Sequence, residues 1–119
     1  MSHQDQLYQP VTKEIAEQRK RLAPNTLEAF KAFSGQVFAD GALSAKTKQL
    51  IAVAVAHVTQ CPYCIRAHSS AALQHGATAE EIMEAIWVAA EMRAGAAYAH
   101  SALALDTIGR ALGDNGASS

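Results

Sequence analysis

Apolar residues recur along most of the chain with the three- and four-residue spacing of α-helices, and strand-like alternation is almost absent. Val11, Ile15 and Leu22 fall on one side of a first helix, which we expect to end before Pro24. The apolar spacing in this first part of the chain therefore predicts an α-helix.

Asn25, with Glu28 three residues later, predicts a capping box and the start of a second helix. After the turn "ADGALS", Ser44 is a candidate N-cap for a third helix that runs to Val58. The third helix is apolar on nearly every side between residues 50 and 56, which predicts burial all round. In so short a chain, this favours a second subunit that covers part of the helix.

"TQ" ends the third helix, and Pro62 suits the first position of a fourth helix that reaches His75, with Gly76 as its C-cap. Thr78 and Glu81 predict another capping box and a fifth helix. Gly95 is a candidate break before a sixth helix, whose stripe contains Tyr98, Ala102, Leu105, Ile108 and Leu112. The pattern predicts an all-α bundle of about six helices, with residues 113–119 as a frayed tail.

Composition narrows the function classes. With 119 residues and no repeat or linker, we expect one domain over residues 1–119. The net charge of -1 offers no basic surface for nucleic acid, and no apolar run is long enough to span a membrane. The polar start "MSHQDQLYQP" is unlike a signal peptide, so we expect a cytoplasmic protein that has no membrane partner.

The only two cysteines, Cys61 and Cys64, lie in "CPYCIRAH" with His68 one helical turn further on. If Pro62 opens a helix, Cys61 is at its N-cap and all three side chains share one face. The helix dipole and the imidazole are expected to lower the pKa of Cys64. Cys64 would then attack a peroxide and become a sulfenic acid, and Cys61 would resolve it as a disulfide.

Other interpretations stay open at this point. One alternative is a zinc site, which needs a fourth ligand, and His57 is the only nearby candidate. Another alternative is that the two thiols are inert core residues. CPYC is also the glutaredoxin tetrapeptide, but the preceding segment is helix-like, which disfavours that βαβ fold. A lone histidine in an apolar helix, such as His57 or His100, is more often a core residue than a catalyst. The sequence contains no phosphate-binding motif that would indicate a cofactor.

Residues 43–90, from "LSAKTKQLIAVAVAHVTQCPYCIRAH" to "HGATAEEIMEAIWVAA", resemble the core of the carboxymuconolactone decarboxylase superfamily, and in particular the AhpD-type alkylhydroperoxidases. The resemblance implies a helical fold that assembles as homotrimers or homohexamers. It also implies reduction of an organic hydroperoxide or a partner peroxiredoxin, with a lipoyl protein or thioredoxin-like dithiol as reductant. Cys64 then matches the cysteine that becomes sulfenic acid, Cys61 its resolving partner, and His68 the proton-relay histidine.

Two positions depart from that pattern. Gln49 stands where the family has a glutamate, and a glutamine cannot accept and release a proton at neutral pH. Tyr63 stands where AhpD itself has histidine. Glu84 and Glu91, seven residues apart and so on one helix face, are candidates to replace the missing carboxylate, although solvated surface glutamates explain them equally well.

The sequence therefore predicts an AhpD-type alkylhydroperoxidase that acts through Cys64, Cys61 and His68, with no bound cofactor or metal. A thiol–disulfide oxidoreductase or redox sensor using the same pair is the first alternative. A decarboxylase-like small-molecule protein is the second.

Overall fold

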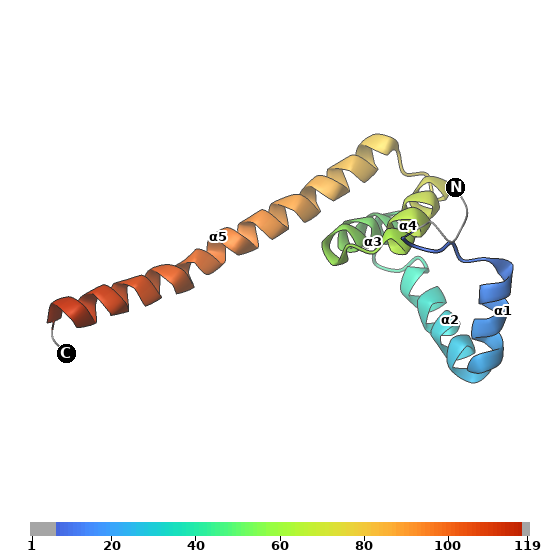
Figure 1. Cartoon of the computed structure of the whole chain (residues 1–119). Coiled ribbons are helices and arrows are strands. Elements are labelled where there is room, and N and C mark those ends of the chain that lie inside the picture. Colours follow the sequence, from blue (N-terminus) through green and yellow to red (C-terminus); the bar gives the residue numbers. More distant parts are fainter. Residues whose placement is uncertain (1–6, 118–119) are drawn as a thin grey trace.

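The computed structural model describes residues 7–117, and every regular element within them is an α-helix (Figure 1). The helices are α1 (Lys13–Leu22), α2 (Pro24–Phe38), α3 (Ala45–Thr59), α4 (Pro62–Gln74) and α5 (Ala79–Ala117). The predicted all-α class is confirmed.

The number of helices differs from the prediction because α5 is continuous for 39 residues. Gly95, the expected break, lies inside α5. A glycine in a helix costs about 1 kcal/mol relative to alanine, which alanine-rich flanks tolerate. α5 also remains helical to Ala117, past Gly113 where the tail was expected to begin; residues 118 and 119 lie outside the described residues.

Helix starts follow local hydrogen bonding. Ser44 caps α3, since its hydroxyl accepts the backbone N–H of Thr47 at 3.1 Å. At the start of α5, Thr78 Oγ1 accepts the N–H of Glu81 at 3.1 Å, and Glu81 Oε1 accepts the N–H of Thr78 at 2.9 Å. The capping box predicted there is confirmed.

The capping box predicted at Asn25 is wrong. α2 begins one residue earlier, at Pro24, with Ala23 as its N-cap and no capping side chain. Proline has no N–H to satisfy and its fixed φ suits the first helical position, so it takes the start of the helix.

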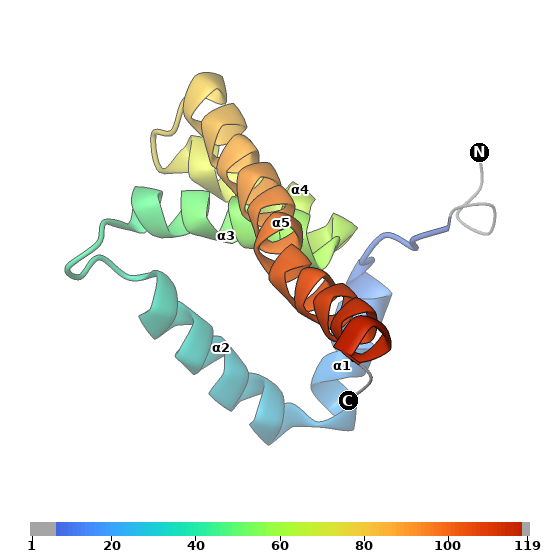
Figure 2. The same ribbon diagram turned by 90° about the vertical axis from the view of Figure 1, so that its left-hand side faces the viewer.

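α3 is the centre of the packing. It contacts α4 on one side and the first half of α5 on the other, whereas α1 and α2 form a hairpin that meets α3 only near the end of α2 (Figures 1 and 2). Close approach of the helices is possible because the buried side chains are small: Ala45, Val53, Ala56, Ala72, Ala77 and Ala89. Gln49 is the one polar side chain buried among the described residues.

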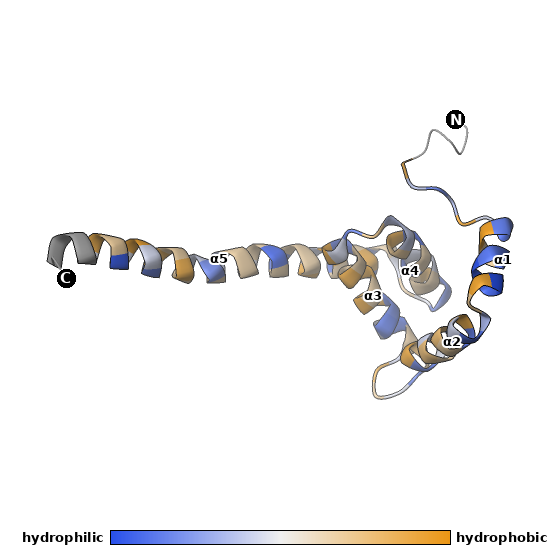
Figure 3. Cartoon of the chain, turned by 60° about the horizontal axis from the view of Figure 1, so that its bottom comes forward, coloured by the Kyte–Doolittle hydropathy of each residue, from blue (hydrophilic) through white to orange (hydrophobic). Residues whose placement is uncertain are grey.

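The second half of α5 extends away from the other helices (Figure 1). The molecule measures 67 × 35 × 34 Å, and its radius of gyration is 21.5 Å. A compact chain of this length has a radius of gyration of about 13.5 Å. Apolar residues nevertheless follow α5 along its exposed length (Figure 3). Over the described residues, no helix combines the length and apolarity needed to cross a bilayer.

Candidate active site

The two cysteines lie where α3 turns into α4. Gln60 adopts a left-handed conformation (φ 59°, ψ 47°), which ends α3 and reverses the chain. Cys61 follows as the N-cap of α4, and Pro62 takes the first position, as predicted. The backbone N–H of Cys64 donates to Cys61 Sγ at 3.3 Å. The sulfur of Cys61 therefore replaces the usual hydroxyl or carboxylate cap.

The two sulfurs lie 2.8 Å apart and share a hydrogen bond. This hydrogen bond, followed by the one from the Cys64 backbone, lowers the pKa of Cys61. The same hydrogen bond is the main reason that the pKa of Cys64 is raised, with burial as a second cause. The expectation of a lowered pKa at Cys64 is therefore wrong for this arrangement: the hydrogen bond between the two sulfurs and the backbone N–H of Cys64 favour the thiolate at Cys61.

His68 is held by residues from two other helices. Its Nδ1 lies 2.7 Å from Oε1 of the buried Gln49 on α3. The ring of Phe38, the last residue of α2, stacks on the imidazole at a centroid distance of 5.1 Å and an interplanar angle of 25°. Because the amide oxygen can only accept, the imidazole donates from Nδ1, and Nε2 is its remaining basic nitrogen.

A small cavity of about 140 Å³ gives access to these groups. Its walls are mostly aliphatic, and both Cys64 and His68 contribute to them, with Ala52, Val55, Ala56 and Thr59. We call it the thiol pocket. A thiol and an imidazole at the wall of a small apolar pocket can react with a small, uncharged molecule.

The other predicted site residues lie elsewhere. Tyr63 points to the N-terminal segment, where its hydroxyl donates to the carbonyl of Gln9 at 2.6 Å and its ring meets Tyr8 edge to face. Glu84 and Glu91 are exposed, about 140–160° around α5 from Ala89, which packs against the core. The structure does not bring these glutamates to His68.

The remaining histidines have structural surroundings. His57 Nδ1 lies 2.8 Å from the carbonyl oxygen of Val53, one turn back on α3, and His100 is exposed on α5. Within residues 7–117, no three side chains of the types that bind metals gather into one site.

Sequence reasoning missed Phe38. It is the last residue of α2 and follows directly after Val37, whereas the apolar residues Phe30, Phe33 and Val37 are spaced three and four apart, so helical spacing does not single out Phe38. The only available signal was its place directly before the turn that leads into α3.

The model of the carboxymuconolactone decarboxylase family matches residues 24–107, which include α2, α3, α4 and most of α5. A Paracoccus denitrificans protein, "Uncharacterized protein 4 in cox locus", is 72% identical over 78 residues, 66% of this chain and 70% of its own. A second relative, from Cupriavidus necator, is 41% identical over 83 residues, 68% of this chain and 74% of its own.

Two solved structures share the fold. One is a carboxymuconolactone decarboxylase family protein from Legionella pneumophila, with 38% identity, a TM-score of 0.62 and coverage of 69% of this chain and 76% of that one. The other, from Methanobacterium thermoautotrophicum, has 37% identity, a TM-score of 0.66 and coverage of 70% and 93%. The chain belongs to the carboxymuconolactone decarboxylase family.

Proposed function

We propose that the protein is a thiol-dependent hydroperoxide reductase of the AhpD type, in which Cys64 and Cys61 cycle between dithiol and disulfide. The observation that carries this proposal is the pair of sulfurs 2.8 Å apart at the start of α4, beside a pocket that Cys64 shares with His68. A disulfide bond is about 2.05 Å long, so the pair needs only a small movement to close.

The reaction begins with the proton between the two sulfurs. When the Cys64 thiol gives its proton to a Cys61 thiolate, the thiolate is at Cys64, which lines the thiol pocket. Cys64 attacks the outer oxygen of the hydroperoxide, the O–O bond breaks, and the alkoxide takes up a proton to leave as an alcohol. The product at Cys64 is a sulfenic acid.

Cys61 completes the cycle. Its sulfur attacks the sulfenic sulfur, and hydroxide leaves as water after it takes a proton. The sum is two thiols and one hydroperoxide converted to one disulfide, one alcohol and one water. An external dithiol, a lipoyl protein or a thioredoxin-like protein, then returns the pair to thiols by disulfide exchange. The cytoplasm supplies such reductants.

Gln49 acts on the reaction through His68. As an amide it cannot take a proton from Nδ1, so it holds His68 in the tautomer that presents Nε2 as the base. Nε2 can accept a proton from Cys64 or return one to the alkoxide. Gln49 is a positioning residue in this scheme, and proton exchange with solvent runs through Nε2.

A second function is favoured by the lowered pKa of Cys61. A thiolate at the helix N-terminus with a second thiol beside it is also suited to attack a disulfide in another protein. In this thiol–disulfide oxidoreductase or redox sensor, Cys61 attacks and Cys64 resolves. Gln49 in place of a glutamate is compatible with it, because disulfide exchange needs no relay through that position.

One set of assays distinguishes the peroxidase from the thiol–disulfide oxidoreductase. Reduced protein is mixed with cumene hydroperoxide or tert-butyl hydroperoxide, with dihydrolipoamide or thioredoxin as electron donor. We expect Cys64→Ser to lower peroxide consumption to background. In Cys61→Ser, we expect dimedone to trap a sulfenic acid at Cys64, identified by mass spectrometry.

His68→Ala should slow the reaction, whereas His75→Ala is the matched control, because His75 is exposed at the far end of the same helix. Peroxide turnover that persists in Cys64→Ser would refute the peroxidase. Background turnover by the unaltered protein, together with rapid reduction of a disulfide substrate that requires Cys61, would establish the second function instead.

A further inference from the structure

α5 carries an apolar stripe that is mostly exposed to solvent. Trp87, Tyr98, Leu105 and Leu112 lie within about 40° of one another around the helix, at 100° per residue. They are 66%, 82%, 65% and 66% exposed. Ala89, which is buried against the core, lies about 160° away from the centre of this α5 stripe. The stripe therefore faces outward even where α5 packs on α3.

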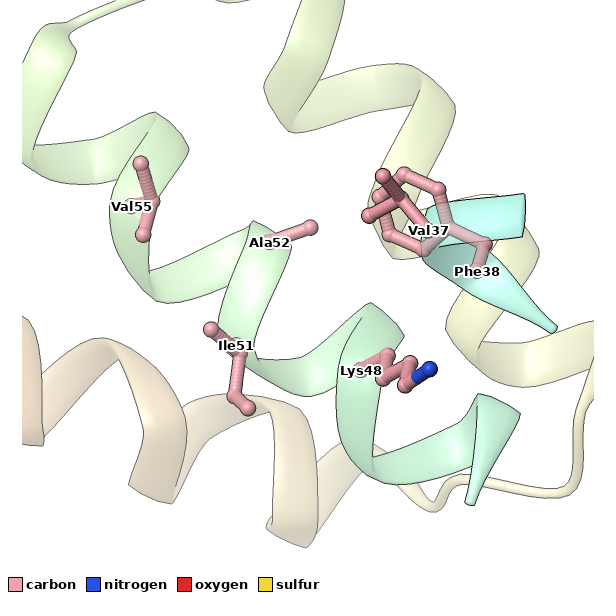
Figure 4. A pocket seen from close by; sticks show the side chains of 6 residues that line it. All are labelled: Val37, Phe38, Lys48, Ile51, Ala52 and Val55. Atoms are coloured by element: carbon pink, nitrogen blue, oxygen red, sulfur yellow. The ribbon is translucent and has the colours of Figure 1, made fainter. Parts of the chain in front are cut away.

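A second apolar surface is open between α2 and α3. Val37 on α2 and Ile51 and Val55 on α3 line a cavity of about 350 Å³, together with Phe38, Lys48 and Ala52 (Figure 4). Phe30 and Phe33 continue the same face of α2, and both are more than 60% exposed. We call this surface the α2–α3 groove. Lys48 is its one charged lining residue, and its Nζ donates to the carbonyl of Ala39 at 2.6 Å.

The exposed area is too large for a chain that works alone. The accessible surface is 9210 Å², whereas a folded monomer of 12.6 kDa exposes about 6200 Å². The excess of about 3000 Å² lies in the range that permanent complexes bury. The net charge of -1 gives copies of the chain little reason to repel one another.

We propose that the α5 stripe of one copy packs into the α2–α3 groove of a second copy. Every copy carries both surfaces, so each can bury the other without a different protein. Their lengths also agree: Tyr98 to Leu112 spans about 21 Å of helix, and the 15 residues of α2 span about 22 Å. Exchange of this kind buries the stripe of every copy when the rotation between copies closes the assembly into a ring or a pair.

The exchange also completes the thiol pocket. Ala52 and Val55 line both the α2–α3 groove and the thiol pocket, so a helix seated in the groove lies next to the opening that leads to Cys64 and His68. The second copy then supplies an apolar wall that limits access to small, uncharged substrates. The contact itself does not depend on the proposed reaction; only this effect on Cys64 does.

Matched substitutions on the two sides of α5 test the contact. Leu105 and Leu103 are 65% and 68% exposed, but they lie about 160° apart around the helix. We expect the unaltered chain to be oligomeric by light scattering coupled to size exclusion. Leu105→Asp should weaken association at least a hundredfold, and Leu103→Asp should leave it nearly unchanged. Equal dissociation by both variants, or a monomeric unaltered chain at 100 μM, would overturn the proposal.

Cross-linking locates the contact without relying on a destabilising change. A photoreactive benzoylphenylalanine in place of Tyr98 should cross-link to residues of α2 or α3 in another copy, as read by mass spectrometry. Cross-links only between two α5 helices would refute the groove as the docking site. In Leu105→Asp, a bulky maleimide should modify Cys64 several-fold faster than in Leu103→Asp. Equal rates would show that the second copy does not cover the pocket, whatever the peroxidase assay shows.

Discussion

The hydrogen bond between Gln49 and His68 can be removed with little change in shape by Gln49→Met. The side chain of Gln49 is 6% exposed, and its Oε1 lies 2.7 Å from His68 Nδ1. Methionine has nearly the same length and volume but offers no comparable acceptor. The substitution therefore leaves the Nδ1–H group without its partner while the packing of α3 is kept.

The size of the effect follows from the burial of the acceptor. Leaving a buried donor unpaired costs about 1–3 kcal/mol. If that energy holds His68 in the reactive tautomer and orientation, its loss lowers the competent fraction, and with it peroxide turnover, about 5- to 150-fold. For a chain of 119 residues, the same energy lowers Tm by about 4–12 °C.

Three measurements check this reasoning. Peroxide turnover gives the functional loss, thermal unfolding at fixed protein concentration gives the stability loss, and ¹⁵N NMR of His68 reports its tautomer. Gln49→Glu is the matched control, because it keeps an acceptor oxygen at the same position and should keep the Nδ1–H tautomer. If Gln49→Met retains both the tautomer and the turnover of the unaltered protein, Gln49 does not position His68.

Two further predictions concern the titrating groups. Cys64→Ala removes the main cause of the lowered pKa of Cys61, so the pH profile of Cys61 alkylation by iodoacetamide should move to higher pH. Cys61→Ala removes the main cause of the raised pKa of Cys64, so the alkylation profile of Cys64 should move to lower pH. Profiles that do not move would show that the thiols do not interact. The pKa of Glu81 is lowered first by Lys46, whose Nζ lies 2.8 Å from Oε2, and then by the N–H of Thr78. The ion pair therefore stabilises the fold above the unfolded pKa of about 4.3, and this stabilisation is lost as the pH falls through the pKa of Glu81 in the folded protein. Lys46→Gln should therefore flatten the loss of stability on acidification, measured by denaturant unfolding from pH 6 to pH 3, and an unchanged acid slope would contradict it.

Local chemistry made much of the site predictable. Pro62 fixed the start of α4, and this in turn placed Cys61 at the N-cap with Cys64 in the first turn and His68 one turn later. Ser44 and the pair of Thr78 and Glu81 likewise marked helix starts, because a cap depends only on residues within three positions. These features needed no knowledge of distant contacts.

The predictions that failed or fell short depended on which side chains meet across helices. Gln49 reaches His68 from 19 positions away because α3 and α4 pack side by side, and Phe38 joins them only because α2 ends against the same place. Which thiol has the lower pKa depends on how the two side chains turn at one helix end, and the hydrogen bond between them lowers the pKa of Cys61 and raises that of Cys64, the thiol expected to be ionised.

Helical spacing alone determined that the protein is all-α and that its two cysteines share one face with a histidine. Only the tertiary structure decided which helix supplies the partner of that histidine, and that Glu84 and Glu91 lie on the far side of α5. The physical reason is that periodicity specifies the faces of each helix, whereas the crossing of helices is set by how small side chains such as Val53, Ala56 and Ala72 pack together.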